Sequence, residues 1–206
     1  MTRENPSSAR TPNALGQTAR QRIVAAAEAV LKKDGFHGFS TRKVAEACGI
    51  SVGNLTYHFP SKRDLVQAVM AEVCARYASL RRAPADAALE RPRAWLTRTL
   101  SFLIKDASGP ETSGLFVELW AIAKHHDFGR ETVDRFYEDA LGWIREDLAL
   151  SYPEASPEAL SRAASLALTL TEGSTALFSR GLTWPGGIED MVETTADAME
   201  ALLKAR

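Results

Sequence analysis

The amino-acid sequence predicts an all-α protein, and three observations carry the prediction. After residue 16, apolar side chains recur every three or four residues, which is the spacing of one helix face. The sequence has no alternating apolar and polar run of the kind that predicts a half-buried strand. Clusters of glycine and proline divide it into segments of helix length. Its 206 residues, 45% of them hydrophobic and 25% charged, suffice for one or two domains with a buried core.

The N-terminal residues differ in composition from the rest of the chain. Residues 1–16 are rich in proline, serine, asparagine and arginine and have no apolar face, which predicts a flexible tail. Arg3 and Arg10 have the charge to touch a nucleic acid, although a solubilising tail is the favoured interpretation. The first helix is expected over Thr18–Lys33, because an Asp-Gly pair follows its last apolar positions.

Two short helices around a tight turn are expected next. Ser40 can cap a helix over Thr41–Ala47, and Cys48-Gly49-Ile50 forms the turn, where glycine supplies left-handed backbone. Ser51 caps the second helix, which ends at His58. This is helix-turn-helix spacing, and the exposed positive end of the second helix favours a phosphate.

The second helix has two faces. Leu55 and Phe59 fall at helical spacing and are expected to face the core. On the other side, Asn54 can form two hydrogen bonds with an adenine edge. The methyl groups of Val52 and Thr56 can touch a thymine methyl. The sequence therefore predicts a helix that can read bases.

Charge is distributed unevenly along the chain. Residues 1–65 contain ten Lys and Arg against five Asp and Glu, a net charge of +5. The remainder contains 15 against 21, a net charge of −6. A basic N-terminal part favours contact of that part with a polyanion. Helix-turn-helix arrangements also occur in proteins that bind no nucleic acid, so this alternative stays open on spacing and charge alone.

Further helices are expected in the rest of the chain. Ser61, with Asp64 three residues later, begins a long helix that ends near Leu80. After a break near Ala83 and Pro84, helical patterns cover residues 92–107, 112–126, 130–150, 157–180 and 187–204. The separators include Ser108-Gly109-Pro110 and Asp127-Phe128-Gly129. We therefore divide the chain into a tail (1–16), a helix-turn-helix domain (17–62) and a larger helical domain (63–206).

The run STRKVAEACGISVGNLTYHFPSKRDL resembles the signature of the TetR/AcrR family of bacterial transcriptional regulators. The resemblance lies in Thr41, in the Gly49-Ile50-Ser51 turn and in the motif Tyr57–Leu65, within a match over about residues 18–66. The chain departs from the pattern at Thr56, where many members have tyrosine. The resemblance implies a set of DNA-facing residues, namely Thr41, Arg42, Ser51, Val52, Gly53, Asn54, Thr56, Tyr57, His58 and Lys62.

These residues have unequal expected roles. We expect phosphate contacts from Thr41, Arg42, Tyr57, His58 and Lys62, and base contacts from Val52, Asn54 and Thr56. The second helix has no arginine for a guanine, so its direct readout amounts to about 1–3 kcal/mol. One copy is too weak to select a genomic site. We therefore expect a homodimer on a double-stranded, palindromic DNA operator.

The last two expected helices have apolar stripes that we assign to this homodimer. The first stripe consists of Leu160, Ala164, Ala167, Leu168 and Thr171. The second consists of Ile188, Met191, Val192, Thr195, Met199, Leu202 and Leu203. Two helices from each chain would form a four-helix interface. Packing within one chain would explain the same stripes.

The larger helical domain, called the body below, has aromatic residues on helices that are already apolar on another side. They are Trp95, Phe102, Phe116, Trp120, Phe136 and Trp143. Core packing is the plain interpretation, and the walls of an apolar ligand cavity are the functional one. The family resemblance implies such a cavity and a small-molecule effector of unknown identity. Possible polar anchors are Glu118, His125 and Glu172.

Other classes of function find little support in the sequence. It has no phosphate-binding glycine loop and no Gly-x-Ser-x-Gly motif, so no catalytic residues and no cofactor are expected. His125 and His126 point about 100° apart on a helix and are poor joint metal ligands, so no metal is expected. Cys48 and Cys74 are expected to be reduced thiols. Without a long apolar run or a secretory signal, we expect a cytoplasmic location and no membrane contact.

The favoured hypothesis is a homodimeric, ligand-responsive transcriptional repressor that is released from its operator by an effector. A DNA-binding protein without an effector, or one that activates, is the first alternative. An enzyme that uses a pocket in the body is the second and less favoured one.

Overall fold

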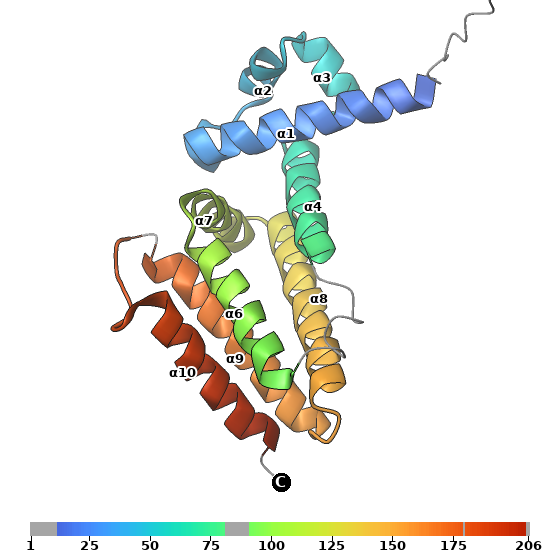
Figure 1. The fold of residues 1–206 in the computed structure, drawn as a ribbon. Coiled ribbons are helices and arrows are strands. Elements are labelled where there is room, and N and C mark those ends of the chain that lie inside the picture. The colour runs from blue at the N-terminus through green and yellow to red at the C-terminus, as the bar shows by residue number, and fades with distance from the viewer. Residues whose placement is uncertain (1–11, 81–90, 179, 205–206) are drawn as a thin grey trace, which may run out of the picture. The chain divides into compact units, whose positions relative to one another are not determined.

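The computed structural model describes residues 12–80, 91–178 and 180–204, and these residues form helices and connecting turns without a strand (Figure 1). The all-α prediction is confirmed. The helices group into two compact units, residues 1–72 and 73–206, which are described separately below. Tail residues 1–11, with Arg3 and Arg10, and the expected break at Ala83 and Pro84 lie outside the described residues.

The first unit contains α1 (Pro12–Gly38), α2 (Thr41–Cys48), α3 (Val52–His58) and the start of α4 (Lys62–Leu80). α1 begins at a proline, which suits the first position of a helix, and thus earlier than the expected start at Thr18. At Gly35 the backbone is left-handed, with φ 65° and ψ 175°. The helix that was expected to end at Asp34-Gly35 is kinked there instead, and α1 continues to Gly38.

Each helix of the first unit contributes apolar side chains to one core. The buried residues are Ile23, Val24, Ala27 and Leu31 from α1, Val44 and Ala45 from α2, Leu55 from α3, and Leu65, Val66, Val69 and Met70 from α4. Phe39 and Phe59, at the ends of the short helices, complete it. Leu55 and Phe59 therefore face the core, as predicted from their spacing.

The second unit contains the rest of α4 and five further helices among the described residues: α6 (Pro92–Ser108), α7 (Pro110–His125), α8 (Asp127–Ser151), α9 (Pro157–Phe178) and α10 (Gly187–Lys204). α6, α9 and α10 pack side by side, α8 packs on α9, and α7 packs on α8 (Figure 1). The predicted helices of the body are confirmed, with ends that differ by up to three residues.

One predicted separator is a helix start instead. Asp127-Phe128-Gly129 forms the first turn of α8, and only His126, with φ −138°, breaks the helix between α7 and α8. A Cβ atom added to Gly129 would lie 2.8 Å from Cγ2 of Ile122 and 3.0 Å from the backbone of Ala123. This glycine therefore permits close contact between two helices. Sequence reasoning took it for a helix breaker.

The apolar stripes of α9 and α10 pack largely within the chain, which corrects their assignment to a dimer interface. Ala164 and Ala167 of α9 and Met191, Val192, Met199 and Leu203 of α10 are buried in the core of the second unit. Trp95, Leu96, Leu100 and Ile104 of α6 belong to the same core. The reason is that α6 packs on both α9 and α10 and covers the faces that carry these stripes.

Candidate nucleic-acid interface and ligand cavity

The turn between α2 and α3 is fixed by its own hydrogen bonds. Gly49 has φ 66° and ψ 33°, and the N–H of Ile50 donates to the carbonyl of Ala45 at 3.0 Å. These features close the C-terminus of α2 in the way that a left-handed residue allows. The Ser51 hydroxyl accepts from the N–H of Asn54 at 3.1 Å and caps α3. The predicted turn and cap are confirmed, and they set the direction of α3.

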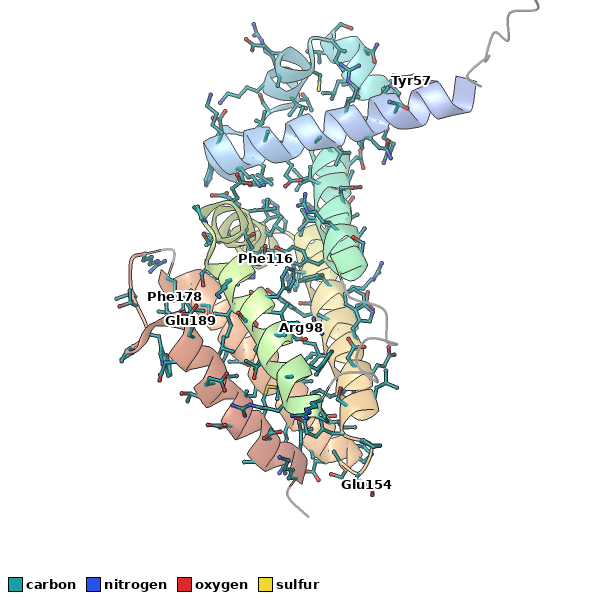
Figure 2. The ribbon with its side chains drawn as sticks, in the orientation of Figure 1. Tyr57, Arg98, Phe116, Glu154, Phe178 and Glu189 are labelled. Atoms are coloured by element: carbon teal, nitrogen blue, oxygen red, sulfur yellow. The ribbon has the colours of Figure 1, made fainter. Side chains whose placement is uncertain are left out.

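The N-terminus of α3 is exposed. Ser51, Val52, Gly53 and Asn54 are all exposed, although Leu55 of the same helix is fully buried. Tyr57 is 84% exposed, on α3 of the first unit (Figure 2). A short helix that is held by one buried face thus presents its first turn to the exterior.

Thr56 and His58 of α3 each interact with another residue of the same helix. The Thr56 hydroxyl donates to the carbonyl of Gly53 at 3.1 Å, and its side chain is half-buried. This bond leaves the Thr56 methyl group as its expected contact with a base. The half-buried ring of His58 lies edge-on to Tyr57, with 5.2 Å between the ring centroids.

Arg20 of α1 fixes the C-terminus of α3, which sequence reasoning missed. Its guanidinium lies 4.1 Å from the centroid of the Phe59 ring, and Nη1 donates to the carbonyl of His58 at 3.1 Å. A cation suits the negative end of a helix. Sequence distance hides this pairing, because 38 residues separate the two partners.

Lys62 has partners inside the first unit. Its Nζ donates to the carbonyl of Phe36 at 2.8 Å and lies 3.9 Å from the centroid of the Phe36 ring. Partial burial lowers the pKa of this lysine. The ammonium therefore closes the last turn of α1, and its expected contact with a DNA phosphate stays a prediction.

α2 supplies the two remaining candidates for phosphate contact. Thr41 is the half-buried first residue of α2, and Arg42 is exposed. The neighbouring Lys43 binds Asp34 at 2.6 Å, and this hydrogen bond lowers the pKa of the aspartate. Of the basic residues on α2, Arg42 is thus the better placed to meet a phosphate.

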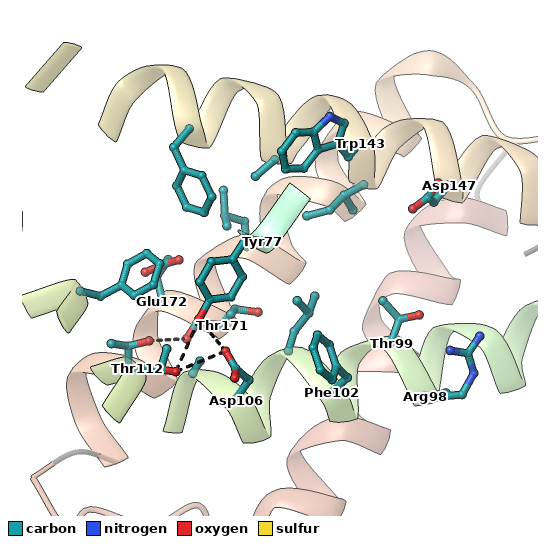
Figure 3. Close-up of a pocket in the computed structure, with 18 of the residues that line it drawn as sticks. Tyr77, Arg98, Thr99, Phe102, Asp106, Thr112, Trp143, Asp147, Thr171 and Glu172 are labelled. Carbon is teal, nitrogen blue, oxygen red and sulfur yellow. Dashed lines mark hydrogen bonds between the residues drawn. The ribbon is translucent and has the colours of Figure 1, made fainter. Parts of the chain in front are cut away.

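The second unit contains a cavity of about 480 Å³, lined by residues of α4, α6, α7, α8 and α9 (Figure 3). Five of the six aromatic residues that we expected at a ligand site line it: Trp95, Phe102, Phe116, Phe136 and Trp143. Trp120 is not among the lining residues. Its indole N–H donates to the hydroxyl of Tyr137 at 2.6 Å instead, since a half-buried indole needs an acceptor.

Polar groups lie at both ends of this cavity. The hydroxyl of Tyr77 on α4 donates to Asp106 of α6 at 2.7 Å, with Thr112 of α7 beside them (Figure 3). Burial is the main cause that raises the pKa of Tyr77. Arg98 and Asp147 lie across the cavity from this group. The site therefore has apolar walls with a few polar side chains, as ligand sites have.

Of the three expected anchors, one lines the cavity. Glu172 of α9 is a lining residue, whereas Glu118 and His125 are not. Burial raises the pKa of Glu172 to about 7, although a hydrogen bond from Tyr137 acts in the opposite direction. The charge of Glu172 thus changes near neutral pH.

Among residues 12–80, 91–178 and 180–204, no three His, Cys, Asp or Glu side chains are grouped so that they could hold a metal ion. No helix in the same ranges combines the length and apolar character that crossing a membrane requires. Cys48 and Cys74 are free, and burial raises the pKa of both thiols, that of Cys74 to about 11.

The chain is similar to known transcriptional regulators, most clearly in its first unit. Residues 23–69 match the family described as bacterial regulatory proteins, tetR family. The HTH-type transcriptional regulator UidR of Escherichia coli strain K12 is 41% identical over 54 residues, which are 26% of this chain and 28% of UidR. The chain thus matches UidR over little more than a quarter of its length.

Two further proteins are similar over nearly the full length. An HTH-type transcriptional regulator from the dhlA 5' region of Xanthobacter autotrophicus is 29% identical over 197 residues, 91% of this chain and 92% of the relative. The structure of Salmonella enterica GusR matches with a TM-score of 0.70 at 20% identity, over 97% of this chain and 100% of GusR. At that identity the structural match shows a shared fold. Residues 23–69, which contain the helix-turn-helix, thus match the TetR family of bacterial regulatory proteins in sequence, and the all-α fold of the chain is shared with GusR.

Proposed function

We propose that the protein is a homodimeric transcriptional repressor that binds a palindromic operator and is released by a small molecule in the cavity of the second unit. The observation that carries the proposal is the exposed first turn of α3, held by the buried Leu55 and the capped turn at Gly49 and Ser51. In a helix-turn-helix, the first turn of the second helix is the part that meets base edges in the major groove.

The residues of this surface divide into two kinds of contact. Val52 and Asn54 stand at the exposed end of α3 and are proposed to read bases. Arg42 and Tyr57 are exposed on α2 and α3 and are proposed to bind phosphates. Phosphate contacts fix the register on the duplex, and base contacts select the sequence.

The exposed faces of α9 and α10 support a homodimer. Ser165 and Thr169 of α9 are exposed, and Gly173 lies one turn further along the same face. Thr194, Ala198 and Ala201 of α10 are also exposed. Such small side chains allow helices of two chains to approach closely. A Cβ atom added to Gly173 would meet nothing within 4 Å in its own chain, so packing within the chain does not require a glycine there.

α4 is the element proposed to carry the effector signal. It begins at Lys62 in the first unit, and Tyr77 of the same helix lines the cavity. A ligand that competes for the hydrogen bond between Tyr77 and Asp106 would change how the second unit holds α4. Such a ligand shifts the protein between states only if it binds them with different affinity.

Selection of bound DNA from a random pool, with and without candidate effectors, tests the proposal. We expect a palindromic site, an affinity that falls steeply with rising salt because phosphates are neutralised, and release by a compound that binds the cavity. An affinity insensitive to salt would contradict DNA binding through this surface. A site that no cavity ligand affects would favour the alternative without an effector, and increased transcription from the site would favour an activator.

A further inference from the structure

The cavity contains one buried carboxylate oxygen that lacks a hydrogen bond. Oε2 of Glu172 is buried and has no hydrogen-bond partner among the described residues. Buried acceptors in native proteins are nearly always paired, so an unpaired one on a side chain that lines a cavity requires an explanation. A ligand that fills the cavity and offers a donor to this oxygen would supply the missing bond.

Neighbouring side chains hold the Glu172 carboxyl group in place. The indole N–H of Trp120 on α7 donates to the Tyr137 hydroxyl at 2.6 Å, and Tyr137 of α8 hydrogen-bonds the carboxyl group of Glu172. Because two helices fix this group from one side, the unpaired oxygen has a defined position. A defined position is what distinguishes a binding group from a side chain that merely adapts to a ligand.

None of the charged side chains that line the cavity places a cation near the Glu172 carboxylate. The acidic lining residues are Asp106, Asp147 and Glu172, and Arg98 is the one basic side chain among the described lining residues. Arg98 lies on the same side of the cavity as Asp147, across from Glu172 (Figure 3). Asp106 accepts from Tyr77, which carries no positive charge. A cation that complements Glu172 therefore has to come from the ligand.

The remaining walls suit a bulky apolar group. Phe102 of α6 and Trp143 of α8 face the space between the two polar ends (Figure 3). Phe116 and Phe136 also line the cavity, with 6.0 Å between their ring centroids. Aromatic faces attract cations as well as apolar groups.

From this geometry we propose that the effector is a lipophilic amine, whose protonated nitrogen donates to Oε2 of Glu172 and whose apolar body lies between Phe102 and Trp143. The inference rests on the proposed function, because it names the chemical class of ligand for the same cavity. Neutral molecules of equal size bind more weakly, since they leave the carboxylate without a counter-charge. Carboxylic acids bind most weakly, since they place a second negative charge beside it.

Titration of Glu172 gives the inference a pH signature. Burial raises the pKa of this carboxyl to about 7, and a bound ammonium lowers it again. The other ionisable groups that line the site are Tyr77 of α4, Arg98 and Asp106 of α6 and Asp147 of α8. Tyr137 hydrogen-bonds Glu172, and Cys74 interacts electrostatically with Tyr137. Burial raises the pKa of both tyrosines, and that of Cys74 to about 11, so these groups stay protonated between pH 6 and pH 8. Affinity for an amine is therefore expected to rise about tenfold across that range as Glu172 ionises.

The experiment compares matched probes on the purified full-length chain. Calorimetry measures the affinity of naphthylalkyl amines of graded chain length, of the alcohols with the same skeleton, and of the corresponding carboxylates, at pH 6, 7 and 8. We expect each amine that fits to bind at least about tenfold more tightly than its alcohol at pH 8. The preference is expected to vanish in Glu172→Gln and to persist in Glu118→Gln, which makes the same change outside the cavity lining. Equal affinity of amine and alcohol in every pair, or a preference for the carboxylate, overturns the inference.

Further measurements test whether the variant is folded and whether amine binding affects DNA binding. Circular dichroism checks that Glu172→Gln is folded, and the pH dependence of amine binding tests the wild-type chain without any substitution. The selected DNA site is then titrated with the amine. Amine binding that depends on Glu172 but leaves DNA affinity unchanged supports the ligand class and contradicts effector release. Release by alcohols or acids, but not by amines, supports the proposed function and overturns the ligand class.

Discussion

Lys62 and Arg42 are similar side chains in different surroundings. Both are basic, and both belong to the DNA-facing set that the sequence predicts. Lys62 donates to the carbonyl of Phe36 and lies over the Phe36 ring, whereas Arg42 is exposed on α2. A hydrogen bond from a charged donor contributes about 1.5–3 kcal/mol when buried, and less when it is half exposed. Lys62 should therefore stabilise the first unit, and Arg42 should bind DNA.

Substitution of each by methionine tests this division, because methionine keeps an unbranched stem and removes the charge. Lys62→Met is expected to lower the free energy of unfolding by about 1–2 kcal/mol, since the Phe36 carbonyl loses its donor. Arg42→Met is expected to leave stability within about 0.5 kcal/mol and to reduce the salt dependence of DNA binding by about one phosphate contact. Urea unfolding and salt titrations of DNA affinity measure both. If Lys62→Met reduces the salt dependence and leaves stability unchanged, Lys62 is a phosphate ligand.

Glu172 makes the stability of the second unit depend on pH. Its pKa is about 7 in the folded chain, above the ordinary value of 4.5, because burial disfavours the charged form. The unfolded chain therefore loses this proton at lower pH than the folded chain does. Below pH 4.5 both states are protonated and the group costs nothing, whereas above pH 7 the folded state contains a buried charge.

Glu172→Gln is accordingly expected to be more stable than the wild type at pH 8, by about 1–3 kcal/mol, with a difference that shrinks as the pH falls toward 4.5. Thermal unfolding of both chains at pH 5, 6, 7 and 8 measures it. Glu118→Gln serves as the control for the amide substitution itself. A difference that stays constant across this pH range would show that Glu172 does not titrate as its burial implies.

The direction of α3 depends on the turn that precedes it. Gly49 is left-handed, with φ 66°, and it is followed by the cap at Ser51. Gly53 stands inside α3, where a helix gains stability from a side chain. A Cβ atom has room at both positions, because it would meet nothing within 4 Å at Gly49 and only the Ser51 oxygen, at 3.9 Å, at Gly53. The two glycines therefore differ in backbone conformation and in their proposed relation to DNA.

Alanine at each position separates these effects. Gly49→Ala is expected to destabilise the first unit by about 1–2 kcal/mol, because a side chain is strained in left-handed backbone. Gly53→Ala is expected to stabilise α3 by up to about 1 kcal/mol and yet to weaken DNA binding, because a methyl group then stands at the surface that approaches the duplex. Chemical unfolding and DNA titration report the two quantities. Unchanged DNA affinity of a folded Gly53→Ala chain would place Gly53 away from the interface.

For the whole molecule, the exposed small residues of α9 and α10 lead to a prediction about assembly. Gly173→Met is expected to weaken a homodimer by at least about tenfold, because a long side chain would separate helices that small residues bring together. Gly114→Met on α7 is the matched control, since an added Cβ atom meets nothing within 4 Å at either position. Sedimentation equilibrium measures both dissociation constants. A dimer that tolerates methionine at 173 uses another surface.

The local features of the helix-turn-helix could be predicted from the sequence. The turn at Gly49, the caps at Ser51 and Ser61 and the inward direction of Leu55 follow from short-range rules, and each is present. Relations over long sequence distances were not predictable in the same way. The contacts of Arg20 with His58 and Phe59 and of Lys62 with Phe36 exist only once the helices pack.

In the body, the sequence determined the apolar faces of the helices and the aromatic residues that they carry, because periodicity along one chain is enough to define a face. Tertiary structure decided what each face meets. α6 covers the stripes of α9 and α10 that the sequence assigned to a dimer, and Gly129 permits contact between α7 and α8. It also placed five of the six aromatics around one cavity and turned Trp120 toward Tyr137, behind the unpaired oxygen of Glu172. Such choices depend on which helices become neighbours, and periodicity within one helix does not contain that information.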